Sequence, residues 1–133
     1  MKLKMFAAAA FLSLFFCFEA FAQQQEQPDI YKQAEMESDR LQRMLDLEDW
    51  QAFYVDSTLM HDFPAMMAEM EEMRSAMVSN ASMYTAVKDK WWDQIDNTFK
   101  KIFNEEQWAA YLKSGAAKAQ KMREKRRLKA SGK

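Results

Sequence analysis

Residues 82–103 read SMYTAVKDKWWDQIDNTFKKIF, and this stretch decides the fold. Apolar side chains and one threonine recur there at every third or fourth position, which is the period of one face of an α-helix. A helix of this length spans about 33 Å at 1.5 Å per residue, roughly the diameter of a small domain. The pattern predicts an all-α protein with a thin, extended body. The repeating positions are Tyr84, Val87, Trp91, Ile95, Thr98 and Ile102, flanked by Trp92 and Phe99.

Few residues of this chain break helices. Its 133 residues include two glycines and two prolines, whereas a sheet protein would need more turn residues. The abundant alanine, methionine, glutamine, glutamate and lysine are good helix formers. We therefore expect one helical domain over residues 29–128, with four to five helices. Their expected ranges are 29–45 with Asp29 as cap, 49–61, 64–79 after a break at Pro64, 82–103, and a last helix from Asn104 that frays beyond Gly115.

The first 22 residues predict export. Two early lysines precede an uncharged, mostly apolar run over 5–18, and Ala20-Phe21-Ala22 follow, which is the order of a secretory signal peptide. A membrane anchor is the alternative, but a span needs about 20 apolar residues, and Glu19 interrupts this run. We expect cleavage after Ala22, a periplasmic location, and a disordered leader over 23–28.

Charge is distributed unevenly along the rest of the chain. Residues 113–133 hold nine lysines and arginines against Glu124 alone, whereas 23–112 hold eight basic and eighteen acidic residues. A basic end favours nucleic acid in a cytoplasmic protein, but the predicted export argues against that partner. The remaining candidate partners are acidic client segments, an anionic membrane surface or the acidic body of a second copy. The alternative is that the basic end has no partner and only aids solubility. We expect its last residues, 129–133, to be disordered.

Two short segments share one pattern. They are Leu47-Glu48-Asp49-Trp50-Gln51 and Phe103-Asn104-Glu105-Glu106-Gln107. In the second, Asn104 can cap a helix while Gln107 reaches back to the N–H of the cap, and Phe103 can pack on Trp108. In the first, glutamate is a poor cap, which leaves Asp46 as a candidate.

Both segments look like degenerate copies of LTxxQ. Together with the signal peptide, the small helical body and the basic end, they make this chain resemble the Spy/CpxP family of periplasmic stress proteins. The resemblance implies four or five helices in a long, curved protomer, often an antiparallel dimer, whose concave face holds partly unfolded envelope proteins without ATP. It also implies that Leu47, Gln51, Phe103, Asn104 and Gln107 are structural.

Four methionines at spacings of four, three and four residues predict a methionine stripe on one helix face. Flexible, polarisable methionine suits a surface that repacks against many partners, so the stripe and Trp92 are the candidate client-binding residues. Trp92 is included because adjacent Trp91 and Trp92 cannot both face one core. The alternative is that the stripe is core. The stripe consists of Met66, Met70, Met73 and Met77.

Metal binding is the second class of function. Thioether sulfur and imidazole bind soft metals such as Cu(I), and the resemblance includes metal-binding relatives, ZraP and CnrX. The candidate ligands are His61, Met60, Met66 and Met70, although a single histidine is a weak signal. A structural envelope protein is the third possibility.

Catalysis is the least supported class of function. The only histidine is His61, the only cysteine, Cys17, leaves with the signal peptide, and no G-x-S-x-G or phosphate-binding glycine loop occurs. We therefore expect a binding protein that uses neither a catalytic residue nor a cofactor.

Overall fold

The computed structural model describes residues 29–132, so the predicted signal peptide and leader lie outside the described residues. Within 29–132 the chain is helical and contains no strand, which confirms the predicted fold class. The elements in order are α1 (Ile30–Leu45), α2 (Asp49–Ser75), α3 (Ala81–Ile102), α4 (Glu105–Tyr111), the π-helical segment η1 (Leu112–Ala116) and α5 (Ala117–Ala130).

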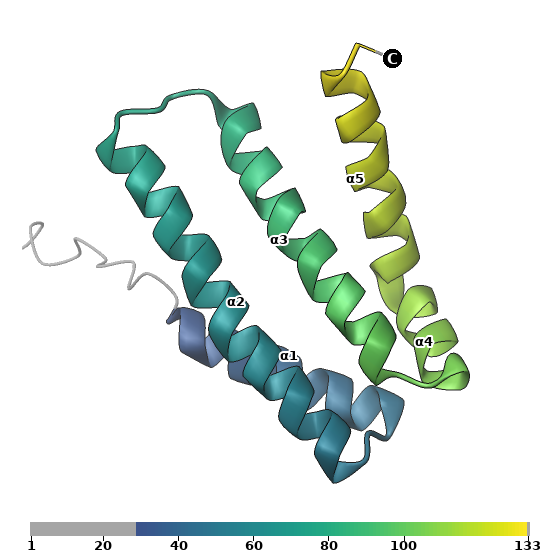
Figure 1. The fold of residues 1–133 in the computed structure, drawn as a ribbon. Coiled ribbons are helices and arrows are strands. Elements are labelled where there is room, and N and C mark those ends of the chain that lie inside the picture. Colours follow the sequence, from purple (N-terminus) through teal and green to yellow (C-terminus); the bar gives the residue numbers. More distant parts are fainter. Residues whose placement is uncertain (1–28, 133) are drawn as a thin grey trace, which may run out of the picture.

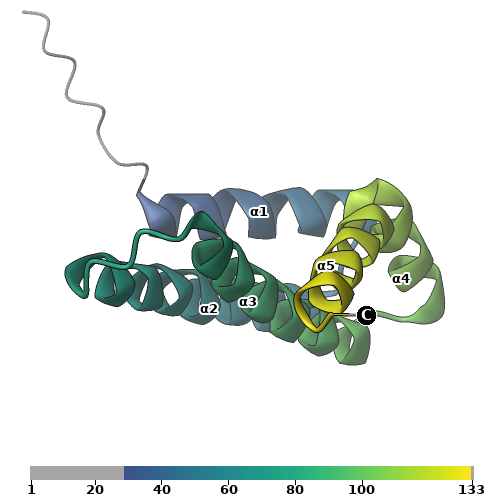
Figure 2. The same cartoon turned by 90° about the horizontal axis from the view of Figure 1, so that it is seen from above.

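The helices form two thin layers. Figure 1 shows α2, α3 and α5 running side by side, with α3 in the middle, and Figure 2 shows α1 lying across one side of this layer. The core lies where α1, α2 and α3 meet, and Tyr111 of α4 closes one end of it. Its buried apolar members are Ala34, Leu41, Leu45, Leu47, Val55, Leu59, Phe63, Met66, Met70, Ile95, Phe99, Phe103 and Tyr111.

The predicted break at Pro64 is wrong, because α2 runs unbroken from Asp49 to Ser75. Proline removes one helical hydrogen bond and disfavours helical geometry at the preceding residue. Here the flanking side chains outweigh that cost, since Phe63 and Met66 are both buried in the core. Phe63 also packs edge-on against Trp92 of α3, with ring centroids 5.6 Å apart. Tertiary packing therefore fuses the two predicted helices into one.

A Schellman turn ends α2. Val78 N–H donates to the carbonyl of Met73 over 3.0 Å, and Met77 N–H donates to that of Arg74 over 2.9 Å. This pattern needs a left-handed residue just beyond the helix, and Met77 supplies it with φ of 58°. The left-handed backbone leaves the Met77 side chain 88% exposed.

Replacing Met77 with glycine should raise the free energy of unfolding by about 1 kcal/mol, because glycine adopts the left-handed region without the Cβ clash. Urea unfolding followed by circular dichroism measures the change. The matched control is Ala76→Gly, one residue earlier at φ of −81°, where glycine should destabilise the protein instead. A loss of stability in Met77→Gly would contradict the prediction.

The chain stays helical beyond Gly115, so the predicted fraying is wrong. Gly115 has φ of 120°, which a residue with a side chain rarely adopts, and it kinks the chain between α4 and α5. From there α5 continues to Ala130, and Lys129 still belongs to it. Contacts with α3, described below, hold this helix in place.

Candidate functional site

The two LTxxQ-like segments meet in the interior. Gln51 Nε2 donates to Gln107 Oε1 over 2.7 Å, and Gln107 Nε2 donates back to Gln51 Oε1 over 3.0 Å. We call this reciprocal pair the glutamine clasp. Both side chains are buried, and they join positions 56 residues apart in the sequence. The clasp ties the α1–α2 turn to the α3–α4 turn.

Each clasp glutamine also serves its own helix start and the opposite turn. Gln51 Oε1 accepts the N–H of Glu48, and Gln107 Oε1 accepts the N–H of Asn104, each over 3.0 Å. The remaining amide protons reach the ends of the other helices: Gln51 donates to the carbonyl of Ile102 (3.0 Å) and Gln107 to that of Leu45 (3.4 Å). The arrangement is close to two-fold symmetric, and it satisfies buried polar groups from both turns at once.

The two helix starts differ in how they are capped. Asn104 Oδ1 accepts the N–H of Gln107 over 2.8 Å and completes a capping box. At the start of α2, Glu48 is the cap residue of a box with Gln51, and its carboxylate also accepts the indole N–H of Trp50 over 2.6 Å. The expectation that Asp46 caps α2 is wrong, because Asp46 ends α1 as its left-handed C-cap residue, with φ of 49°.

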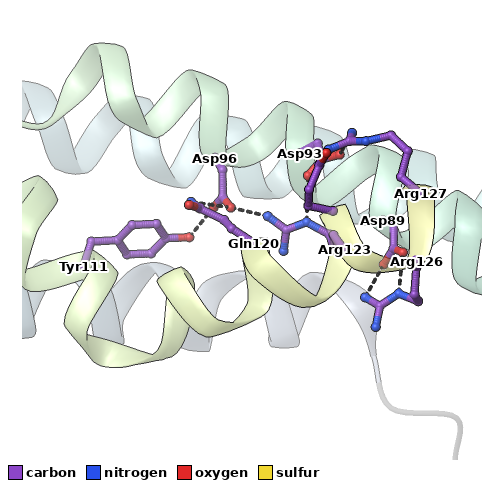
Figure 3. Close-up of polar contacts among 9 residues, drawn as sticks. Asp89, Asp93, Asp96, Tyr111, Gln120, Arg123, Arg126 and Arg127 are labelled. Carbon is purple, nitrogen blue, oxygen red and sulfur yellow. Dashed lines mark hydrogen bonds and ion pairs between the residues drawn. The ribbon is translucent and has the colours of Figure 1, made fainter. Parts of the chain in front are cut away.

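Ion pairs hold α5 against α3, as Figure 3 shows. Three aspartates of α3 face three arginines of α5, and the helices meet through these long side chains rather than through a close backbone contact. We call the set the arginine–aspartate ladder. It consists of Arg123–Asp96 at 2.5 Å, Arg123–Asp93 at 2.7 Å, Arg127–Asp93 at 3.1 Å and Arg126–Asp89 at 2.7 Å.

Asp96 is the buried centre of the ladder. Its carboxylate accepts hydrogen bonds from Arg123, from Tyr111 Oη over 2.6 Å and from Gln120 Nε2 over 3.0 Å. Burial, followed by the hydrogen bond to Asp96, raises the pKa of the Tyr111 hydroxyl well above its usual value. Tyr111 therefore stays protonated and donates to Asp96 at any physiological pH.

Three aromatic side chains stand exposed at the start of α2. Trp50 is 51% exposed, Phe53 66% and Tyr54 54%. Their rings touch: the centroids of Trp50 and Tyr54 are 6.3 Å apart and those of Phe53 and Tyr54 5.6 Å apart. We call these three residues the aromatic patch. Contiguous exposed apolar surface of this kind marks interaction sites.

The aromatic patch is not among the site residues predicted from the sequence. The sequence does contain a signal for the patch, which is a helical stripe of residues that begins at Gln51. Because Gln51 is buried, the adjacent Trp50 points outward. Helical spacing from Gln51 continues through the buried face of α2, which leaves Phe53 and Tyr54 on the opposite side. The buried face consists of Gln51, Val55, Leu59, Asp62, Phe63, Met66 and Met70.

The methionine stripe is divided between core and surface. Met66 and Met70 are buried in the core, and Met73 is half-buried. Met77 is exposed because it occupies the left-handed turn position. A client could reach Met66 and Met70 only if α2 separated from its neighbours.

Trp91 and Trp92 are both half-buried on the side of α3 that packs against α2. Trp92 packs against Phe63, and Trp91 Nε1 donates to Glu69 over 2.7 Å. Lys90 donates to the same carboxylate, and these two hydrogen bonds, that of Lys90 first, lower the pKa of Glu69. Neither tryptophan is left fully exposed for a client.

The candidate metal ligands do not converge. The His61 side chain is 75% exposed, and its Nδ1 lies 2.7 Å from Asp62 Oδ1. Met66 and Met70 instead point into the core, and Met60 packs at the edge of the core. Within residues 29–132, no three histidine, cysteine or carboxylate side chains gather as a potential metal site.

Among the described residues, no helix combines the length and the apolar character that crossing a membrane requires.

No protein-family model, curated protein or solved structure matches this chain.

Proposed function

We propose that this protein is a periplasmic, ATP-independent chaperone-like or envelope-stress binding protein that holds partly unfolded envelope proteins. It acts through its surface rather than through a catalytic pocket. The observation that carries the proposal is the aromatic patch, which leaves three large rings in solvent on a chain with a small core. Burying such rings against a partner is strongly favourable.

The chemistry of the aromatic patch suits varied, partly unfolded partners. Trp50 and Tyr54 combine a large apolar face with a polar edge, so they tolerate both solvent and a bound chain. Two exposed carboxylates, Glu48 and Asp49, lie beside the patch. Charge next to exposed rings keeps the free protein soluble.

The glutamine clasp supports the resemblance to the Spy/CpxP family. It gives the glutamine of each LTxxQ-like segment a defined role, because each glutamine is the buried hydrogen-bond partner of the other. In this proposal Leu47, Gln51, Phe103, Asn104 and Gln107 build the frame, and the aromatic patch, rather than the methionine stripe, contacts the client.

Changing the patch to Trp50→Ser, Phe53→Ser and Tyr54→Ser should weaken client holding by about tenfold or more, since buried aromatic residues dominate binding energies. Aggregation of reduced insulin, followed by light scattering without ATP, measures protection. The reductant is harmless here because residues 29–132 contain no cysteine. The matched control is Tyr31→Ser, Met36→Ser and Met83→Ser, which removes three exposed apolar residues that are not adjacent.

Two outcomes would contradict the proposal. One is that the unaltered protein fails to suppress aggregation even in excess. The other is that the control variant loses as much protection as the patch variant. Light scattering of the protein alone adds a further distinction. If the patch variant changes from dimer to monomer while protection persists, the patch is a subunit interface instead.

A further inference from the structure

The arginines and the lysines of α5 lie on opposite faces of the helix. Its three arginines face α3 and form the arginine–aspartate ladder. Its four lysines are all exposed and recur at spacings of three, four and four residues, so they share the opposite face of the helix. We call them the lysine face. It consists of Lys118, Lys121, Lys125 and Lys129.

The lysine face has no counter-charge in the part of the chain that the structure describes. None of its four ammonium groups takes part in an ion pair there, and the one acidic residue of α5, Glu124, pairs with Arg127. The three aspartates of α3 are occupied by the arginines. Docking of α5 thus neutralises its arginines and leaves its lysines free for an external partner.

The lysine face is a ridge rather than a groove. Two hollows flank α5, one of about 540 Å³ beside α1 and one of about 1350 Å³ beside α3. Lys118, Lys121 and Lys125 line neither, whereas Lys129 lines the one beside α3. Figure 1 shows α5 as the outermost helix of its layer. The twelve residues from Lys118 to Lys129 extend about 16 Å. Exposed Met122 (46%) and Leu128 (44%) lie on α5 as well.

We propose that the lysine face docks the protein on the anionic phosphate headgroups of a lipid membrane surface. A membrane is a flat array of negative charge, which a straight ridge of lysines can contact along its whole length. Clusters of four or more basic residues on a surface helix have this affinity. Met122 and Leu128 would enter the interfacial layer beside the lysine stems.

An acidic polypeptide is the competing partner. An extended chain gains most of its affinity from a groove or a sheet edge that binds its backbone and side chains. Along Lys118, Lys121 and Lys125 the ridge offers neither, so the shape favours the membrane. The inference does not depend on client holding, because the aromatic patch lies on α2 and the lysine face on α5.

Co-sedimentation of the full chain with vesicles tests the proposal. Vesicles that contain phosphatidylglycerol should retain the protein at low salt and release it at high salt, whereas vesicles of phosphatidylcholine alone should retain much less. Changing Lys118, Lys121, Lys125 and Lys129 to glutamine should weaken vesicle binding by about a hundredfold or more, because each lysine near an anionic surface contributes about fivefold to the affinity. All four positions are exposed, so circular dichroism should show an unchanged fold.

The control variant replaces four exposed lysines outside α5, Lys32, Lys88, Lys100 and Lys101, with glutamine. It has the same net charge and the same N-terminal residues as the first variant, so any vesicle binding by the apolar N-terminal run is common to both. Retained binding in this control supports the proposal. Equal loss in both variants, equal binding to both vesicle types, or binding to polyglutamate without binding to vesicles would each overturn it.

Discussion

Substituting leucine for Gln51 should lower the free energy of unfolding by about 3 kcal/mol. Leucine preserves the approximate volume but removes every hydrogen bond that the Gln51 amide makes. The N–H of Glu48 then loses its acceptor and the carbonyl of Ile102 loses its donor. Gln107 also loses both bonds of the clasp and keeps only those to Asn104 and Leu45. A buried polar group left without a partner costs about 1–3 kcal/mol, and two such groups are created here.

Urea unfolding of three variants separates the clasp from a general effect of losing a glutamine. Gln33→Leu changes an exposed glutamine of α1 and should change the stability by less than about 0.5 kcal/mol. The double variant Gln51→Leu with Gln107→Leu should lose less than the sum of the two single variants, because neither side then leaves the other unpaired. Strict additivity would show that the two glutamines act independently and that the clasp contributes nothing as a pair.

The helix starts around the clasp can be predicted from the sequence, but the pairing of its two glutamines cannot. A glutamine three residues after a cap predicts a helix start, and helices do begin beside both LTxxQ-like segments. The hydrogen bonds between Gln51 and Gln107 join residues 56 positions apart. No local pattern encodes such a pairing, because it depends on how the two turns pack in space.

Local signals were outweighed most clearly in α2. Pro64 carries a strong local preference for ending a helix, yet burial of Phe63 and Met66 on either side of it favours continuity. The same helix shows that apolar character alone does not decide which side chains are buried. Trp50 is intrinsically apolar, but the clasp fixes the rotation of α2 so that the polar Gln51 faces inward and Trp50 faces solvent.

The predicted site residues could be located by type but not by environment. A methionine stripe was correctly seen as one helix face through Met66 and Met70, and sequence alone left core and surface both open. The structure buries these two methionines. The basic end was visible as a charge excess, but composition could not show that Arg123 lies inside and Lys125 outside.

Replacing Arg123 with methionine should have the largest effect of any single change in α5, a loss of about 3–5 kcal/mol. The Arg123 side chain is 6% exposed, and its guanidinium group pairs with Asp96, whose side chain is 8% exposed. Methionine can fill much of the space of the arginine stem, but it leaves the Asp96 charge buried with only Tyr111 and Gln120 as donors. Breaking a buried ion pair from one side typically costs this much.

Arg126 provides the matched control for Arg123, because it lies on the same helix and also pairs with an aspartate of α3. Its side chain is 43% exposed, so Arg126→Met should cost far less than Arg123→Met. Adding Asp96→Asn to Arg123→Met removes the unpaired charge while an amide oxygen can still accept from Tyr111, so more than half of the loss should be recovered. Hydrogen exchange should show faster exchange in α5 of Arg123→Met, with α1 and α2 little changed. Equal losses for Arg123→Met and Arg126→Met would instead mean that burial of the Asp96 charge is not what holds α5 on α3.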